Sequence, residues 1–414
     1  MFNFLSQGNK KLIRNFFSLY ILKITNIIIP LIVFPYLVRV LGIDNFGKLA
    51  VAQSFGLFFL VFIEFGFDLS IVRVLSKKTN NVNKLSEVSS IVMLLKIFLV
   101  LLVATVYFPI IIFFPKFSQD IIVYLCVFGF LMGQGFFPTW FFQSVQDMKF
   151  IAILNIFSKL ISLVLIFILI KDKNDYVWYP FLLMLGYIMI LPIAVYIMVK
   201  KYNVKFFIPN YKKLLLYFKY SFNFFLSRIS LRLYEQSGMI LIGLLLPELL
   251  VGYYAIADKL RNAVLSIYSP LSQALYPYMV KYKNKNFYKK FFIFLNILNI
   301  VAVVIGFLFT DTILQIIFNL SSPEIISLVR IFLVVILFDV CSVFLGYPLL
   351  GAFGYTNYVN YSLIVTALIY LFFLGIFYLF NSIDIFIMAY LYLATILFEF
   401  TLRGYGSFLY KLWK

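Results

Sequence analysis

Residues 15–38 read NFFSLYILKITNIIIPLIVFPYLV, a run in which Lys23 is the only charged side chain. A helix crosses a bilayer with roughly 20 mostly apolar residues, so this run is long enough to span the membrane. Working outward, eleven further runs of the same kind fill the chain. We therefore predict an all-α integral membrane protein with twelve transmembrane helices, at 15–38, 46–67, 88–108, 120–141, 151–170, 176–199, 221–246, 250–279, 291–310, 325–347, 356–380 and 385–410.

The composition supports the same class. Hydrophobic residues are 64% of the 414 residues and charged residues only 12%, which is more apolar surface than one soluble core can bury. The chain has no His, and this excludes His-based acid–base catalysis and His metal sites. Its two Cys lie far apart in apolar runs, so we predict small buried side chains and neither a disulfide framework nor a metal site.

Basic residues are distributed unevenly over the loops. If the N-terminus is cytoplasmic, the loops on that side carry 20 Lys and Arg and the outer loops carry five. Basic residues favour cytoplasmic loops, so both termini are predicted to be cytoplasmic. The net charge of +19 then reflects topology and contact with anionic lipid head groups, and nucleic acid is not an expected partner. The first run lacks a small-x-small cleavage site, so we expect it to be retained as a helix.

A shift of 205 positions matches the chain to itself. It carries Leu41, Gly47, Ala50 and Ala52 onto Leu246, Gly252, Ala255 and Ala257. Repeats with an even number of spans enter the membrane from the same side and are related by an axis along the membrane normal. We therefore predict two pseudo-symmetric six-helix bundles around a central cavity, at 1–199 and 221–414, joined by a basic cytoplasmic linker at 200–220.

The same shift places Lys23 on Arg228. Each lies about eight residues into its span, roughly 12 Å from the cytoplasmic end, so we expect the two cations to face each other across the axis. Arg228, Arg232 and Glu235 follow i, i+4, i+7 spacing and therefore share one helical face. Because charges in the hydrocarbon region are costly, this face is predicted to look into protein or water.

Other charged side chains lie inside or at the ends of the predicted spans. They are Glu64, Asp68, Arg73, Lys96, Lys159, Asp258, Lys259, Arg261, Arg330 and Asp339. For each one separately, a structural ion pair is the competing interpretation. Together, cations outnumber anions, which favours an anionic passenger because Lys and Arg bind phosphate through charge-assisted hydrogen bonds.

The opening motif resembles a known family. Residues 15–23, continued by residues 30–47, are similar to the opening of Wzx-type polysaccharide flippases of the multidrug/oligosaccharidyl-lipid/polysaccharide exporter superfamily. Residues 64–73, 140–143, 251–259 and 269–277 are similar to other segments of that family. The resemblance covers nearly the whole chain, including both predicted bundles.

This resemblance implies a transporter and not an enzyme. It implies a protein of the bacterial cytoplasmic membrane that moves undecaprenyl-pyrophosphate-linked oligosaccharide repeat units from the cytoplasmic to the outer leaflet by alternating access, for O-antigen or capsule assembly. No cofactor is expected apart from a coupling H⁺ or Na⁺. The expected partners are membrane lipids, the lipid-linked substrate, a polysaccharide polymerase and a chain-length regulator.

On this basis we assign roles to the charged residues. We expect Lys23, Lys96, Arg228, Arg232 and Arg330 to bind the pyrophosphate and sugars. The candidates for coupling-ion binding are Glu235, Asp258 and Asp339, and Glu64, Asp68 and Arg73 form a gate or motif group. No catalytic or metal-binding residue is expected.

Three alternatives stay open at this stage. A multidrug exporter of the same superfamily would carry cationic ligands and need an acidic cavity. A membrane polysaccharide polymerase or acyltransferase would be expected to have a large outer loop or a catalytic His. A purely structural membrane subunit would leave the symmetric cations unexplained.

Overall fold

The computed structural model describes residues 7–75 and 81–413, with side chains from residue 20 on. Every regular element in these residues is a helix, and nine of the described helices are long and apolar enough to cross a membrane. The predicted all-helical, multi-pass membrane protein is therefore confirmed. The start of the chain and residues 76–80, which the sequence places on the cytoplasmic side, lie outside the described residues.

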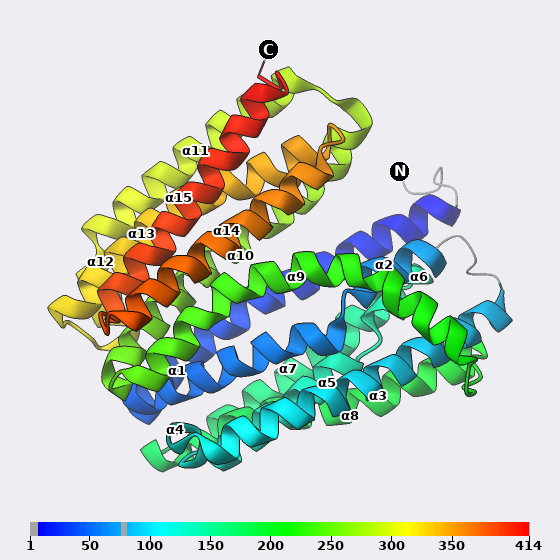
Figure 1. The fold of residues 1–414 in the computed structure, drawn as a ribbon, viewed down its shortest axis with the longest axis horizontal. Helices are drawn as coiled ribbons and strands as arrows, with labels where there is room; N and C mark the ends of the chain where they lie inside the picture. The colour runs from blue at the N-terminus through cyan, green and yellow to red at the C-terminus, as the bar shows by residue number, and fades with distance from the viewer. Residues whose placement is uncertain (1–6, 76–80, 414) are drawn as a thin grey trace. The chain divides into compact units, whose positions relative to one another are not determined.

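The chain forms two compact units, and α1 and α9 contribute residues to both. The first unit contains residues up to Ile29 and Ala52–Arg232. The second contains Pro30–Val51 and the residues from Leu233 on. Figure 1 labels the helices along the chain.

The helices of the first unit are α1 (Gln7–Glu64, shared), α2 (Phe67–Leu75), α3 (Val82–Phe113), α4 (Pro115–Ser118), α5 (Ile121–Phe136), α6 (Thr139–Ser144), α7 (Lys149–Leu169), η1 (Lys173–Val177), α8 (Trp178–Tyr202) and most of α9 (Tyr211–Leu245). Both α5 and α7 pack on α8, and α2 packs on α6. The aromatic run Trp140, Phe141 and Phe142 on α6 is fully buried. This run anchors the core of the unit.

The predicted linker is held against the first unit. Residues 203–210 are not helical. The backbone N–H groups of Lys205 and Phe207 donate hydrogen bonds of 2.9 and 3.1 Å to the hydroxyls of Ser86 and Ser90 on α3. The linker therefore runs along α3 before α9 begins at Tyr211.

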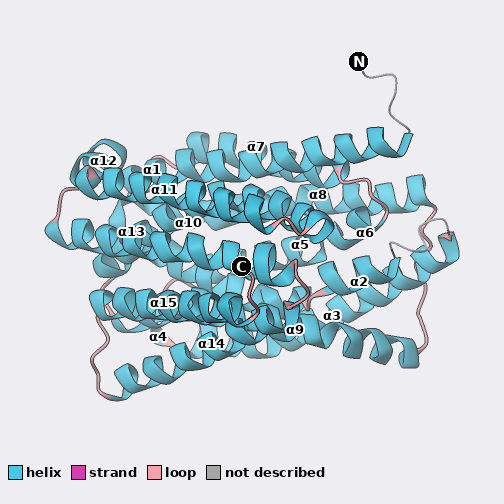
Figure 2. Ribbon diagram, turned by 90° about the horizontal axis from the view of Figure 1, so that it is seen from above, coloured by secondary structure: helices cyan, strands magenta, loops and turns pink. Residues whose placement is uncertain are grey.

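The helices of the second unit, besides parts of α1 and α9, are α10 (Glu248–Tyr282), α11 (Lys285–Leu308), α12 (Thr310–Phe318), α13 (Pro323–Phe344), the π-helical η2 (Leu345–Gly351), α14 (Thr356–Leu379) and α15 (Ile385–Leu409). Figure 2 shows α13 between α11 and α15, and it packs on both as well as on α10. This places α13 at the centre of the unit.

The first two predicted spans form one continuous element. Gly42, with φ 82° and ψ 166°, is the single non-helical residue inside α1 and separates its two helical halves. The spans predicted at 221–246 and 250–279 are helical as α9 and α10, but they are not among the nine apolar helices of the described residues. Their embedded charges, including Arg228 and Arg261, explain the difference. The arrangement of twelve spans in two bundles stays a prediction.

Two glycines that the repeat relates to each other meet inside the second unit. A Cβ on Gly47 would lie 2.7 Å from the carbonyl oxygen of Glu248 and 2.8 Å from the nitrogen of Gly252. A Cβ on Gly252 would clash in the same way with the carbonyl oxygen of Ile43. Because the shift of 205 carries Ile43 onto Glu248 and Gly47 onto Gly252, the contact is self-complementary. Only glycine allows the two helices to approach this closely.

This contact makes a testable prediction about stability. Gly252→Ala puts a methyl group against the backbone of the other helix, and overpacking of this kind costs about 1–3 kcal/mol. We expect a lower Tm for the purified protein in detergent. Gly375→Ala and Gly404→Ala are matched controls, since a Cβ there meets nothing within 4 Å. An unchanged Tm for Gly252→Ala would mean that the close approach is not part of the folded state.

Candidate functional site

The sequence EFGFD, residues 64–68, breaks the chain between α1 and α2. Phe65 has φ 46° and Gly66 has φ 70°, and the left-handed region favours glycine and strains phenylalanine. The Phe65 ring stacks on Phe218 and Phe225 of α9, with centroids 4.5 and 4.7 Å apart, and these contacts offset the strain. The break places Glu64 at the end of α1 and Asp68 in the first turn of α2.

Five charged residues gather around this break in the first unit. Glu64 interacts electrostatically with Asp68, Lys96, Arg228 and Arg232. Lys96 is 2% exposed and donates a hydrogen bond to the carbonyl oxygen of Gly135 on α5. Its amine is thus enclosed by protein in this structure and balances the two carboxylates. Three cations stand against two carboxylates, so this cluster has an excess of positive charge.

Arg228 is exposed, whereas Arg232, Glu64 and Asp68 are half-buried. A ligand can therefore approach Arg228 more easily than Lys96. Lys23 is half-buried on the part of α1 that belongs to the first unit. Arg73 is exposed near the end of α2.

A second cluster surrounds Arg261 in the second unit. Its guanidinium lies 3.5 Å from Asp258 on α10 and 3.5 Å from Asp339 on α13. It donates a hydrogen bond to the hydroxyl of Tyr392 on α15, and Glu235 on α9 also interacts with it electrostatically. The structure thus brings the three predicted ion-coupling carboxylates together around Arg261. Arg261 itself was not among the predicted site residues.

A neighbouring ion pair also escaped the predicted site residues. Arg403 and Glu399 on α15 lie 2.6 Å apart, and both are buried. Arg403 donates to the carbonyl oxygen of Ser342 at 3.0 Å and to the hydroxyl of Ser362 at 3.2 Å, and Tyr234 donates to Glu399 at 3.1 Å. In the sequence, the i, i+4 spacing of Glu399 and Arg403 was the pattern that indicated an ion pair on one helical face. Because each charge has several partners, the pair fixes α15 to α13, α14 and α9.

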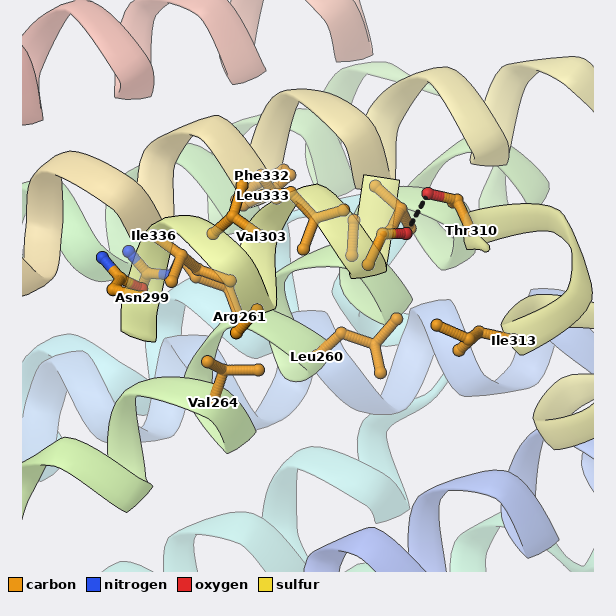
Figure 3. A pocket seen from close by; sticks show the side chains of 14 residues that line it. Leu260, Arg261, Val264, Asn299, Val303, Thr310, Ile313, Phe332, Leu333 and Ile336 are labelled. Carbon is orange, nitrogen blue, oxygen red and sulfur yellow. Dashed lines mark hydrogen bonds between the residues drawn. The ribbon is translucent and has the colours of Figure 1, made fainter. Parts of the chain in front are cut away.

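An apolar cavity of 180 Å³ lies between α10, α11, α12 and α13. Figure 3 shows Arg261 and Asn299 near one end and Thr310 and Ile313 near the other. Nearly all other lining side chains are aliphatic, with Phe332 as the aromatic one. A cavity of this size and lining suits a short stretch of hydrocarbon and not a charged sugar head group.

Arg330 lies outside both clusters in the structure. Its guanidinium stacks over the ring of Phe307 on α11, 4.8 Å from the centroid. A cation over an aromatic face is a stabilising contact, and it links α13 to α11. Among the described residues, no group of three or more Asp, Glu or Cys side chains is arranged to hold a metal ion.

The span-length helices and the charged side chains held inside them define a multi-pass membrane protein with polar groups in its interior. The chain belongs to the polysaccharide biosynthesis protein family, whose model matches residues 12–283. It is 27% identical over 267 residues to the protein named "Putative O-antigen transporter" of Escherichia coli K12. It is also 27% identical over 279 residues to the protein of the same name from Shigella dysenteriae. These findings confirm the family resemblance predicted from the opening motif.

These sequence matches cover part of each protein. The E. coli match spans 64% of this chain and 64% of the relative, and the Shigella match spans 67% and 69%. The chain therefore spans just under two thirds of the length of the E. coli relative.

Solved structures share the fold over nearly the whole chain. The lipid II flippase MurJ in an inward closed conformation matches with a TM-score of 0.69 and 15% identity, over 96% of this chain and 87% of that one. An inward-facing multidrug resistance MATE family transporter of the MOP superfamily matches with a TM-score of 0.65 and 12% identity, over 92% and 96%. The chain therefore shares its fold with a lipid II flippase and with a multidrug exporter.

The buried pair on α15 makes a testable prediction. Glu399→Gln leaves the charge of Arg403 without its carboxylate, and breaking a buried pair from one side costs about 3–5 kcal/mol. We expect a clear drop in Tm in detergent, with exposed Lys212→Gln as the control. The double variant Glu399→Gln/Arg403→Met should lose less than the sum of the single variants. Additive losses would show that the two residues do not act as a pair.

Proposed function

We propose that this protein flips undecaprenyl-pyrophosphate-linked oligosaccharide repeat units from the cytoplasmic to the outer leaflet, for O-antigen or capsule assembly. The observation that carries the proposal is the cluster at the α1–α2 break, where three cations outnumber two carboxylates and Arg228 is exposed. Arginine binds pyrophosphate oxygens in pairs of parallel hydrogen bonds. The names of the O-antigen transporter relatives support the same substrate class.

The architecture we propose has twelve spans in two six-helix bundles around a central cavity, at 1–199 and 221–414, with the linker at 200–220. The halves of α1 before and after Gly42 count as two spans, and α9 and α10 complete the set. Both termini are cytoplasmic in this proposal, because 20 of the 25 loop Lys and Arg residues then face the cytoplasm. The membrane is the bacterial cytoplasmic membrane.

In the proposed mechanism, Lys23, Arg228 and Arg232 hold the pyrophosphate and sugars while the lipid tail stays in the bilayer. Rocking of one bundle against the other exposes the site to alternate sides. Lys96 supports this site by offsetting part of the negative charge of Glu64 and Asp68. Its amine is bound to the carbonyl oxygen of Gly135, so we assign it a supporting role. The proposal also includes two less central roles. Arg73 belongs to the gate group, and Arg330 contacts the substrate.

The proposed energy source is a coupling H⁺ or Na⁺ bound at Glu235, Asp258 or Asp339. All three carboxylates interact electrostatically with one arginine, Arg261, so a cation that neutralises one of them changes the charge balance around Arg261. A polysaccharide polymerase and a chain-length regulator are the proposed protein partners. A multidrug exporter with cationic ligands is less compatible with the excess of cations at the α1–α2 break.

The substrate site is tested by Arg228→Glu/Arg232→Glu in a strain that lacks its own flippase and makes the matching repeat unit. Each lost arginine–phosphate contact costs roughly 1.5–3 kcal/mol, or about 10-fold or more in rate. We therefore expect surface polysaccharide at background level and lipid-linked units retained on the cytoplasmic side. Lys219→Glu, an exposed reversal on the same helix, is the control, and membrane levels are compared by immunoblot. Wild-type production by the double variant would disprove the site.

The coupling site is tested by Asp339→Asn in proteoliposomes. The amide keeps the size of the side chain but removes the negative charge of Asp339, which contacts Arg261. Asp258 remains as the other carboxylate in contact with Arg261. We expect flipping to lose its stimulation by an imposed H⁺ or Na⁺ gradient while gradient-free exchange persists. Asp311→Asn, at an exposed position of α12, is the control. Full gradient stimulation of Asp339→Asn would remove Asp339 from the coupling site.

A further inference from the structure

A lysine and an asparagine meet in the first unit, outside the charged cluster at the α1–α2 break. The ammonium group of Lys159 on α7 donates a hydrogen bond of 2.6 Å to the side-chain oxygen of Asn26 on α1. Lys159 lies ten residues after the start of α7 at Lys149, which places it roughly 15 Å along the helix. The hydrocarbon core is about 30 Å thick, so this charge lies near its middle.

Lys159 differs from Lys96 and Arg403 in its charge balance. Lys96 interacts with Glu64 and Asp68, and Arg403 pairs with Glu399. Within the described side chains, Lys159 has no carboxylate partner, and Asn26 is its one hydrogen-bond acceptor. The stretches 1–19 and 76–80 contain no Asp or Glu in the sequence. The positive charge of Lys159 is therefore not neutralised by the protein.

The position of Lys159 on α7 excludes an orientation toward lipid. The exposed apolar stripe of α7 contains Ile153, Phe157, Leu160 and Val164, which follow helical spacing. Lys159 lies off this stripe, and its amine reaches α1. A charge without a counterion is not stable against hydrocarbon, so this side of α1 faces water or a polar ligand.

The group formed by these side chains offers hydrogen-bond donors only. Lysine has three N–H donors and no acceptor. The side-chain oxygen of Asn26 is already used by Lys159, which leaves the two N–H donors of its amide. Lys23 precedes Asn26 by three residues and so lies on the same face of α1. A group that offers only donors and contains two cations is complementary to an oxyanion. It does not suit a cation, or a neutral ligand that has few hydrogen-bond acceptors.

We propose that Lys159, Asn26 and Lys23 form a binding subsite for an oxyanion of the translocated substrate. This inference rests on the proposed function, and it adds Asn26 and Lys159, two residues that no sequence pattern had assigned to substrate. The oxyanion is a phosphate of the pyrophosphate link or a carboxylate of an acidic sugar, since both present the same acceptor oxygens. At this subsite the anion meets Lys159, whose hydrogen-bond partner is the neutral Asn26, whereas Glu64 and Asp68 partly neutralise the cations at the α1–α2 break.

The decisive variant is Asn26→Asp. A carboxylate there forms an ion pair with Lys159 and cancels the charge that the substrate needs, so binding falls while the fold keeps or gains stability. We expect the affinity of the full-length purified protein in nanodiscs for undecaprenyl pyrophosphate to drop about tenfold or more. Lys159→Gln should show a similar drop, and Lys159→Arg should retain binding. Lys149→Gln, at the start of the same helix, is the matched control, and Tm is measured for every variant.

The outcomes separate the inference from the proposed function. Loss of binding to sugar-free undecaprenyl pyrophosphate identifies a phosphate as the ligand. Loss only with a lipid-linked oligosaccharide that carries a uronic acid identifies a sugar carboxylate. Wild-type affinity of Asn26→Asp and Lys159→Gln for both probes overturns the subsite and leaves the proposed function intact. If the wild-type protein binds neither probe, the proposed function and the subsite both fail.

Discussion

A charge inside the hydrocarbon region has no water to solvate it, so an ion buried there must find its partners within the protein. Arg403 meets this constraint with Glu399, Ser342 and Ser362, and Lys96 meets it with a backbone carbonyl and two carboxylates. These contacts determine which helices can pack together. Ser342 of α13, for example, bonds to both members of the ion pair on α15, and the two helices pack against each other.

The same constraint separates structural charges from functional ones. Glu399 and Arg403 are buried and have several partners each, so a ligand would gain nothing by approaching them. Arg261 is shared between carboxylates on two helices, Asp258 on α10 and Asp339 on α13. Lys159 has only a neutral partner, which leaves an excess of positive charge. Lys159 and Arg261 thus meet the constraint in different ways, the first with a neutral amide and the second with carboxylates.

Much of the fold followed from apolar length and from the position of charges along the chain. The string from Glu64 to Arg73 and the spacing of Arg228 and Arg232 identified residues that the structure brings near one break. Tertiary pairing was harder to predict, because Ser342 and Arg403 are separated by most of two helices and become neighbours only through the packing of α13 on α15. Lys96 illustrates the same limit, since its acceptor is a backbone carbonyl without a side-chain signature. The spacing of residues along the sequence indicates which side chains share a face of one helix. Which side chains meet across two helices depends on how those helices pack.

The contact between Gly47 and Gly252 has an evolutionary consequence. Because Ile43 and Gly47 meet Glu248 and Gly252 in a reciprocal way, one copy of this surface is complementary to a second copy of itself. A side chain added at either glycine therefore meets backbone of the other helix. Neither position can be replaced freely while the other helix stays in place, so this one contact restricts two distant positions of the sequence at once.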